Sequence, residues 1–156
     1  MPRRGNISKR DVNPDAKYNS KLVSKFINSL MLDGKKSTAQ SILYESFEII
    51  ESRAKEDGFA VFRQAINNVK PVLEIRPRRV GSQTYQVPVD VKAERKQRLA
   101  FSWIIQSARS RGERRMAERL AGEILEASQN EGGAIRRKMD QHRMAEANRA
   151  FAHYRW

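Results

Sequence analysis

The segment 75–89 limits the fold of this chain more than any other part of its sequence. Two runs of strand-forming residues flank a turn at Gly81, which predicts a β-hairpin. Each predicted strand contains a proline, Pro77 or Pro88, and a proline cannot donate a hydrogen bond to a neighbouring strand. Neither strand can therefore lie inside a larger sheet, so we expect a two-stranded ribbon over residues 72–91. Because such a ribbon is only marginally stable alone, the rest of the chain has to supply a core.

Apolar residues recur at helical spacing in six other segments of the chain. The predicted helices begin near Ser20, Ser37, Phe59, Asp90, Met116 and Ile135, and they are ended or separated by Gly34, Gly58, Pro71, Gly112 and Gly132-Gly133. Ser37 and Gln40 have the spacing of a capping box, and Asp90 is placed to cap the fourth helix. The pattern predicts a mainly α fold, a six-helix bundle with the ribbon projecting between helices three and four.

The length of 156 residues suits one domain over residues 1–156. Residues 1–18 lack periodicity and are rich in basic and polar residues, which predicts an extended basic arm. The last segment, 149–156, is aromatic and basic, and we expect it to form a C-terminal tail. The sixth helix, which precedes it, is expected to be built around Ile135, Met139, His142 and Glu146.

The chain carries 31 Lys and Arg residues against 18 Asp and Glu residues, a net charge of +13. This excess predicts binding to phosphate backbones, with an anionic membrane surface as the second choice. Cysteine is absent, which excludes disulfides and thiolate metal sites. No apolar run approaches the roughly 20 residues that cross a bilayer, and no signal-peptide pattern opens the chain. We therefore expect a soluble protein inside the cell.

The basic residues gather in five clusters that alternate with acidic helices. The clusters are Arg3, Arg4, Lys9 and Arg10; Lys35 and Lys36; Arg76, Arg78 and Arg79; Lys92, Arg95 and Lys96; and Arg109, Arg111, Arg114 and Arg115. Any one of them could be a solvated face, but all five together favour a nucleic-acid ligand. RNA is preferred to DNA because no helix-turn-helix or zinc module is present. Tyr85, Tyr154 and Trp156 could stack on exposed bases, although packing against the bundle is at least as good an interpretation of Trp156.

Catalysis is difficult to build from these residues. His142 and His153 are the only histidines, and neither has a Ser or Cys nucleophile near it in sequence. The carboxylates show no metal-ligand spacing, and most lie three or four residues from an arginine, where helix-surface pairing explains them. We predict no enzyme activity, no metal and no cofactor. An RNA chaperone, a membrane-surface module and a nuclease remain as alternatives to a structural RNA-binding protein.

Six segments also carry a family resemblance. They are Pro-Asp-Ala-Lys-Tyr at 14–18, Phe-Ile-Asn-Ser-Leu-Met at 26–31, Gly-Lys-Lys at 34–36, Arg-Arg-Val-Gly at 78–81, Tyr-Gln-Val-Pro-Val at 85–89, and the run 144–156 that ends in Phe-Ala-His-Tyr-Arg-Trp. On these residues the chain resembles bacterial small-subunit ribosomal protein seven, the universal family uS-seven, essentially from end to end. Ser82 and Ser102 depart from the family pattern, which often has Gly-Gly at the ribbon turn, here Gly81-Ser82, and usually has arginine before Trp103.

The resemblance implies a structural constituent of the small ribosomal subunit, located in the cytoplasm within the ribosome. Such a protein binds the 3′ domain of small-subunit (16S) rRNA and nucleates assembly of the subunit head. It lies at the subunit interface near the decoding centre, with exit-site tRNA and mRNA nearby and with small-subunit ribosomal proteins nine and eleven as neighbours. We expect the five basic clusters to contact rRNA, apart from Arg79. The residues expected near tRNA or mRNA are Arg78, Arg79, Gly81, Tyr85, Arg143 and Tyr154.

Overall fold

The computed structural model describes residues 11–154. Its elements are α1 (Lys21–Leu30), α2 (Lys36–Ala54), α3 (Gly58–Val69), β1 (Leu73–Val80), β2 (Gln83–Asp90), α4 (Ala93–Arg109), α5 (Met116–Ser128), α6 (Gly132–Ala147) and the short 3-10 helix η1 (Arg149–Tyr154). The expected mainly helical fold, with a ribbon between the third and fourth helices, is confirmed. The predicted contacts of Arg3, Arg4, Lys9, Arg10 and Trp156 lie outside the described residues.

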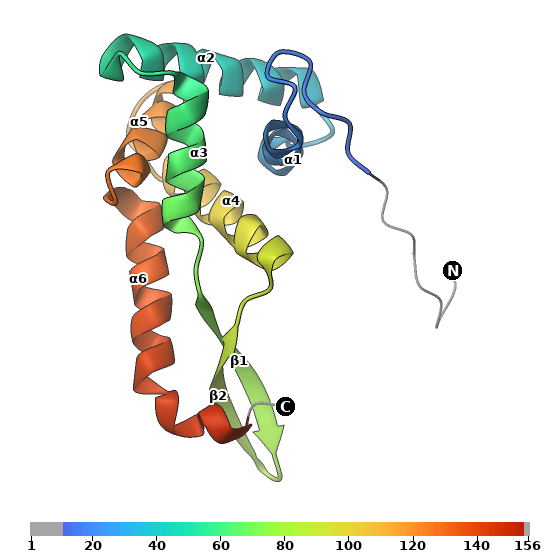
Figure 1. Ribbon diagram of the computed structural model, residues 1–156, viewed down its shortest axis with the longest axis vertical. Helices are drawn as coiled ribbons and strands as arrows, with labels where there is room; N and C mark the ends of the chain where they lie inside the picture. Colours follow the sequence, from blue (N-terminus) through green and yellow to red (C-terminus); the bar gives the residue numbers. More distant parts are fainter. Residues whose placement is uncertain (1–10, 155–156) are drawn as a thin grey trace.

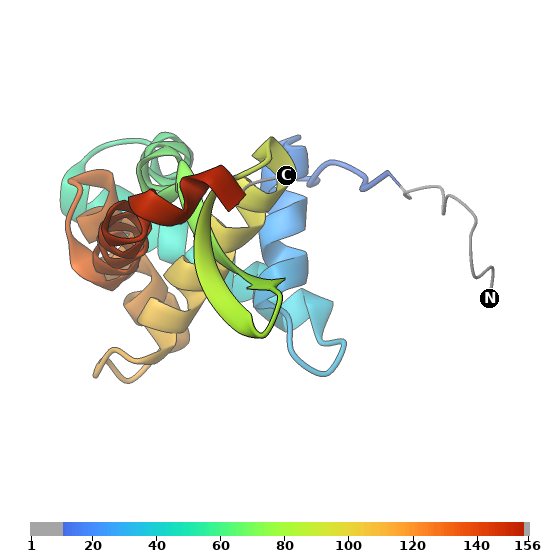
Figure 2. The same ribbon diagram turned by 90° about the horizontal axis from the view of Figure 1, so that it is seen from below.

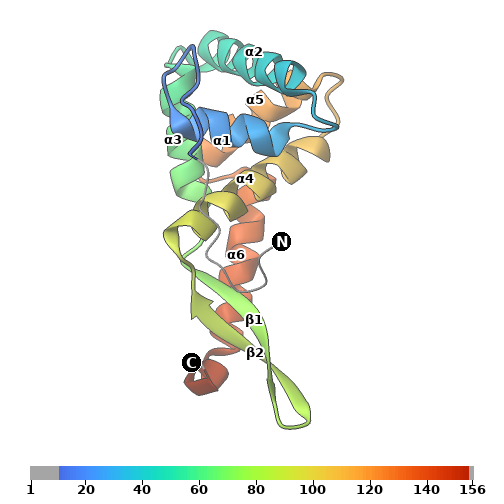
Figure 3. The same ribbon diagram turned by 90° about the vertical axis from the view of Figure 1, so that its right-hand side faces the viewer.

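Helices α1 to α5 pack into a bundle, with α2 across the end farthest from the ribbon (Figure 1). Three phenylalanines, Phe26, Phe47 and Phe62, are fully buried at its centre. Phe62 contacts the other two, with ring centroids 5.0 Å from Phe26 and 5.2 Å from Phe47. Helix α6 begins against α4 and α5 and then extends away from the bundle beside the ribbon, so the two projecting elements share one end of the molecule (Figures 1 and 3).

Strands β1 and β2 form a two-stranded antiparallel sheet, as the prolines predicted. Pro77 lies opposite Gln86, and Pro88 lies opposite Ile75. The two-residue turn has a positive φ of 63° at Gly81, whereas Ser82 has no positive φ. This is the pattern of hairpin turns that need glycine only at the first central position, so serine is accommodated at the second.

The C-terminal segment packs on the ribbon. After α6, η1 turns across β2 (Figure 2). The Tyr85 ring lies 5.1 Å from that of Tyr154 and 5.2 Å from that of Phe151, measured between centroids. At the root of the ribbon, His142 Nε2 accepts a hydrogen bond from the Val72 amide at 3.0 Å. The predicted tail is therefore helical through Tyr154 and is fastened to the ribbon.

Two predicted helix caps are wrong. Helix α2 begins at Lys36, so Ser37 lies inside it, and Gln40 Nε2 donates to Tyr44 Oη instead of the backbone. Asp90 ends β2, and the residue that precedes α4 is Lys92, which makes no side-chain cap. The side-chain cap that sequence reasoning missed is Asp57, which accepts from the amides of Phe59 and Ala60 at the start of α3.

Two further expectations about the ends of the domain need correction. Met139 is 56% exposed and Glu146 is also exposed, because α6 leaves the bundle after its first turns and cannot bury a continuous stripe. Gly132 and Gly133 belong to α6. The predicted arm 1–18 is too long at its inner end, since Asp15 is buried and accepts hydrogen bonds from the Tyr18 amide and Tyr44 hydroxyl.

Candidate nucleic-acid interface

The root of the ribbon joins two of the predicted basic clusters through one carboxylate. Glu74, at the start of β1, is 5% exposed. Its Oε1 lies 2.5 Å from Arg76 Nε on the same strand, and its Oε2 lies 2.5 Å from Arg95 Nε on α4, 21 residues further along the chain. Beside this pair is a cavity of about 230 Å³ lined by Arg76, Lys92, Glu94, Arg95 and Arg98. Lys92 is exposed there, whereas Lys96 is half-buried.

The tip of the ribbon presents exposed cations. Arg78 and Arg79 are both exposed on β1, and Arg79 Nε donates to the Gly81 carbonyl at 3.3 Å. Arg143 is in the last turns of α6, and α6 extends beside the ribbon at this end of the molecule (Figure 1). Its side chain is 82% exposed and reaches Asp140 only at 4.0 Å, which is a weak surface pair. These predicted tRNA-proximal residues therefore gather where the ribbon and α6 project.

The predicted aromatic pair has a partner within the chain. Tyr85 and Tyr154 stack on one another with an interplanar angle of 26°, and both side chains are half-buried. The Tyr85 hydroxyl also contacts Gln83 Oε1 at 2.5 Å. A base that stacked on either ring would have to share it with this intramolecular contact.

The start of α2 places Lys35 and Lys36 on the surface, with no acidic residue in the first helical turn. Lys35 also lines an apolar cavity of about 470 Å³, together with Leu30, Ile42, Arg109 and Met116. Arg109, at the end of α4, donates from Nη2 to the Leu30 carbonyl at 3.3 Å. The fold therefore brings Arg109, from the cluster of four arginines between α4 and α5, beside Lys35 at the start of α2.

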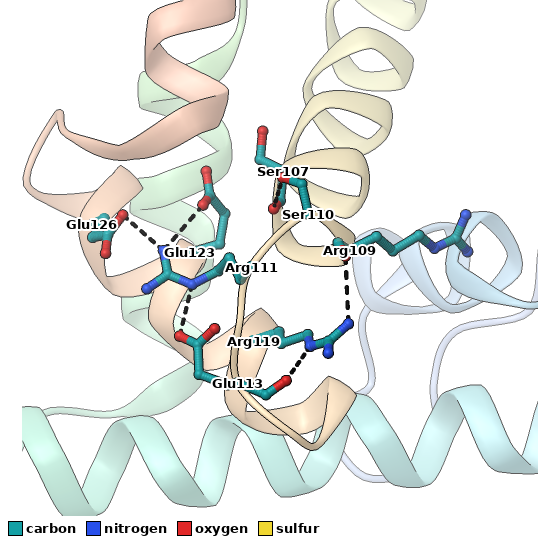
Figure 4. Close-up of polar contacts among 8 residues, drawn as sticks. All are labelled: Ser107, Arg109, Ser110, Arg111, Glu113, Arg119, Glu123 and Glu126. Atoms are coloured by element: carbon teal, nitrogen blue, oxygen red, sulfur yellow. Dashed lines mark hydrogen bonds and ion pairs between the residues drawn. The ribbon is translucent and has the colours of Figure 1, made fainter.

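Arg111, Arg114 and Arg115, the other arginines of this cluster, have different surroundings. The guanidinium of Arg111 contacts three carboxylates, Glu113 at 2.8 Å, Glu126 at 2.9 Å and Glu123 at 3.4 Å (Figure 4). Arg115 pairs with Glu45 of α2 at 2.5 Å, and Arg114 is exposed. Sequence reasoning treated all four arginines alike, and it missed that the charge of Arg111 is neutralised inside the fold.

Around Arg111, which we call the α4–α5 corner, burial and ion pairing shift the pKa values of two carboxyl groups in opposite directions. The hydrogen bond from Arg111 lowers the pKa of Glu113. Burial raises the pKa of Glu123, although its Oε1 accepts a 2.7 Å hydrogen bond from the Ala134 amide. The contacts with Glu126 and Glu113 raise the pKa of Arg111. The corner is thus a tightly paired structural cluster that links the α4–α5 loop to the start of α6.

A groove between α1 and α4 adds two cations that sequence reasoning missed. A cavity of about 610 Å³ is lined by residues that include Lys25, Asn28, Ser29, Gln97 and Arg98. Lys25 and Arg98 are both exposed. Arg98 lies one helical turn after Arg95, and this spacing was the available signal for placing it on the same face. Asp11 and Glu94 also line the groove, so its acidic and basic residues are equal in number. The groove adjoins the cavity at the root of the ribbon, since Glu94 and Arg98 line both.

Neither a metal cluster nor a spanning helix is found in the described part of the chain. No three His, Asp or Glu side chains within residues 11–154 are grouped to hold a metal ion. Over the same residues, no helix has the length and apolarity needed to cross a bilayer. His142 is occupied by the Val72 amide, and burial and the charge of Lys138 lower its pKa.

Exposed cations on a rigid helical scaffold with a projecting ribbon define a class of protein whose surface fits a polyanion. The particular family follows from sequence comparison. Residues 2–149 match the family model described as ribosomal protein S7p/S5e. Small ribosomal subunit proteins uS7 of Acetivibrio thermocellus and Natranaerobius thermophilus are each 60% identical over 156 residues, covering 100% of both chains. The uS7 protein of Clostridium botulinum is 57% identical over the same length. The chain belongs to the ribosomal protein S7p/S5e family, which is a family of structural proteins and not of enzymes.

Proposed function

We propose that this protein binds the 3′ domain of small-subunit rRNA and orders it during assembly of the subunit head. It is a structural constituent of the small subunit of the cytoplasmic ribosome. The observation that carries the proposal is the surface that runs from the ribbon along α4 to α1. Arg76, Arg95, Arg98 and Lys25 are all exposed along it, on elements that are far apart in sequence.

Binding acts mainly through neutralisation of phosphates where RNA helices meet. The bundle holds the cations at fixed spacing, and the stability of its core offsets their mutual repulsion. Binding of phosphates then relieves this repulsion, which favours the complex. If about six phosphates are engaged, affinity falls by roughly a thousandfold between about 50 and 200 mM salt. This steep salt dependence is the signature of the proposed interface.

The end of the molecule formed by the ribbon tip, α6 and η1 is the part that we assign to exit-site tRNA and mRNA. Arg78, Arg79 and Arg143 supply its charge. The exposed apolar side chains of Met139 and Met144 on α6, 56% and 44% accessible, supply a surface for a neighbouring protein. We assign the neighbours to small-subunit ribosomal proteins nine and eleven, on the strength of the family resemblance.

Equilibrium binding to a transcript of the rRNA 3′ domain tests the proposal, with excess unrelated structured RNA as competitor. We expect tight binding that survives the competitor and leaves the RNA intact. Binding that the competitor abolishes would favour an RNA chaperone instead, and cleavage of the transcript in magnesium would favour a nuclease. Binding to anionic vesicles in place of RNA would favour the membrane-surface alternative.

Arg79→Glu tests the part played by the ribbon tip. We expect roughly tenfold weaker binding to the ribosomal target that contacts the tip, because one cation is replaced by a repelling anion. The helical circular dichroism and the melting temperature should not change, since the residue is exposed on the projecting ribbon. Arg53→Glu is the matched control, because Arg53 is exposed in the last turn of α2, at the far end of the bundle. Equal losses in both variants would show that only net charge matters.

A further inference from the structure

We propose that Glu74 is a positioning residue that fixes Arg76 and Arg95 as one phosphate-binding pair at the root of the ribbon. The inference deepens the proposed RNA-binding function and rests on it. A carboxylate in an RNA-binding surface is at first sight unfavourable, because it repels phosphates. The geometry of Glu74 gives it a different role.

Glu74 is buried, and both of its oxygens are used. Oε1 accepts from Arg76 and Oε2 accepts from Arg95, each at 2.5 Å, so the carboxylate bridges β1 and α4. Its side chain is only 7% exposed, whereas those of Arg76 and Arg95 are 47% and 45% exposed. The carboxylate therefore lies beneath the two guanidinium groups and cannot itself meet a ligand that approaches from solvent.

Both arginines are held by Nε, which is the inner nitrogen of the guanidinium. Phosphate oxygens are gripped in pairs by the guanidinium group, and its terminal nitrogens are the ones farthest from the Glu74 carboxylate. A free arginine has to lose side-chain entropy when it binds, whereas an arginine already oriented by a carboxylate loses less. Glu74 thus converts two flexible cations into a preorganised pair.

The surroundings fit one phosphate group. The adjoining cavity of about 230 Å³ is lined by Lys92 and Arg98 in addition to the two arginines. Glu94 also lines this cavity, and Glu74 lies behind Arg76 and Arg95, so the cations there outnumber the carboxylates. A phosphate at this position would contact a strand and a helix together and would fix the ribbon relative to the bundle.

Glu74→Gln distinguishes positioning from simple charge. Removing a negative charge raises the net charge by one, so charge counting predicts stronger RNA binding. Positioning predicts the opposite, because the amide of glutamine can accept from one arginine but presents a donor to the other. We expect affinity for the 3′-domain transcript to fall by about threefold to tenfold at moderate salt.

Glu131→Gln is the matched control. Glu131 is exposed, caps no backbone amide with its side chain, and precedes α6, whose first residues pack against α4 and α5. It undergoes the same change in charge, and we expect its affinity to stay equal to wild type or to rise slightly. A Glu74→Gln protein that binds as tightly as this control would overturn the proposal.

Two readouts separate positioning from loss of fold. After affinities are scaled to the folded fraction from melting curves, the slope of log affinity against log salt should be shallower by about 0.9 for each phosphate lost. In an Arg95→Ala background, Glu74→Gln should no longer weaken binding, because the pair is already broken. An unchanged salt slope, or an equal loss in that background, would refute the assignment. Failure of the wild-type protein to bind the transcript specifically would instead refute the proposed function.

Discussion

Two ion-pair clusters in this molecule have opposite charge ratios. At the α4–α5 corner one cation, Arg111, faces three carboxylates. At the root of the ribbon one carboxylate, Glu74, faces two arginines. The corner uses up its cation within the fold, whereas the root leaves a surplus of positive charge at the surface. The ratio of charges around an arginine therefore separates a structural role from a ligand-binding role, which a count of arginines along the sequence cannot do.

The corner is expected to show the largest effect on stability. Arg111→Ala would leave Glu123, which is 1% exposed, buried without its cation. Removing one partner of a buried ion pair is costly, because it leaves the other charge buried alone. The partial exposure of Arg111 and the hydrogen bond from the Ala134 amide reduce this cost. We therefore expect the free energy of unfolding to fall by about 2–3 kcal/mol. Urea denaturation measures it.

Arg114→Ala is the control for this prediction, since Arg114 is exposed three residues further along the same loop. Its free energy of unfolding should stay within about 0.5 kcal/mol of wild type. RNA affinity per folded molecule should be unchanged in Arg111→Ala. A specific loss of RNA affinity with unaltered stability would reverse the comparison and make Arg111 a phosphate ligand.

The overall architecture could be read from the sequence because its determinants are local. Pro77 and Pro88 exclude a larger sheet, Gly81 marks the turn, and the helical stripes follow from spacing alone. Other errors arose where long-range packing decides. Gly133 illustrates this, because a Cβ there would lie 3.0 Å from the Ser107 side chain of α4. The glycine therefore permits α4 and α6 to pack closely, and it does not break the helix.

The interface could be predicted only as a set of basic residues. The contact of Arg95 with Glu74 spans 21 residues, and the contact of Arg111 with Glu123 spans 12 residues. Neither spacing falls within a helical turn, and each depends on how two elements meet. The sequence consequently predicts which cations cluster along the chain, but not which carboxylates neutralise or orient them in the fold.

A smaller effect is expected where the ribbon meets the C-terminal segment. Tyr154→Ala removes the ring stacked on Tyr85, a contact worth about 0.5–1.5 kcal/mol. Because the contact joins two projecting elements and not the bundle core, we expect faster amide hydrogen exchange in β2, with protection of α3 unchanged. Tyr154→Phe keeps the ring and should restore slow exchange. Equal loss of protection in α3 would show that ribbon and bundle unfold as one unit.

The smallest expected effect is a pH dependence that has opposite signs at the two clusters. Burial, and then the charge of Lys138, lower the pKa of His142 beside the ribbon root from its usual value of about 6.5. The neutral ring accepts the hydrogen bond from the Val72 amide. The unfolded chain then binds more protons below about pH 6.5, so stability is lost as the pH falls through the folded-state pKa. Glu123 at the corner has a raised pKa, so its folded state binds the extra proton and stability is gained as the pH falls towards 4.5.

The two contributions overlap in whole-protein measurements, so the wild-type curve has to be compared with that of His142→Gln. Glutamine does not titrate and retains an acceptor for the Val72 amide. We expect the variant to lose less stability than wild type when the pH is lowered from 7 to about 5.5, because only the wild-type unfolded state gains a proton at this position. Parallel curves would show that His142 titrates equally in both states. The hydrogen bond from the Val72 amide would then not depend on a neutral His142 ring. The stability of the ribbon root would not vary with pH, in contrast to that of the corner around Glu123.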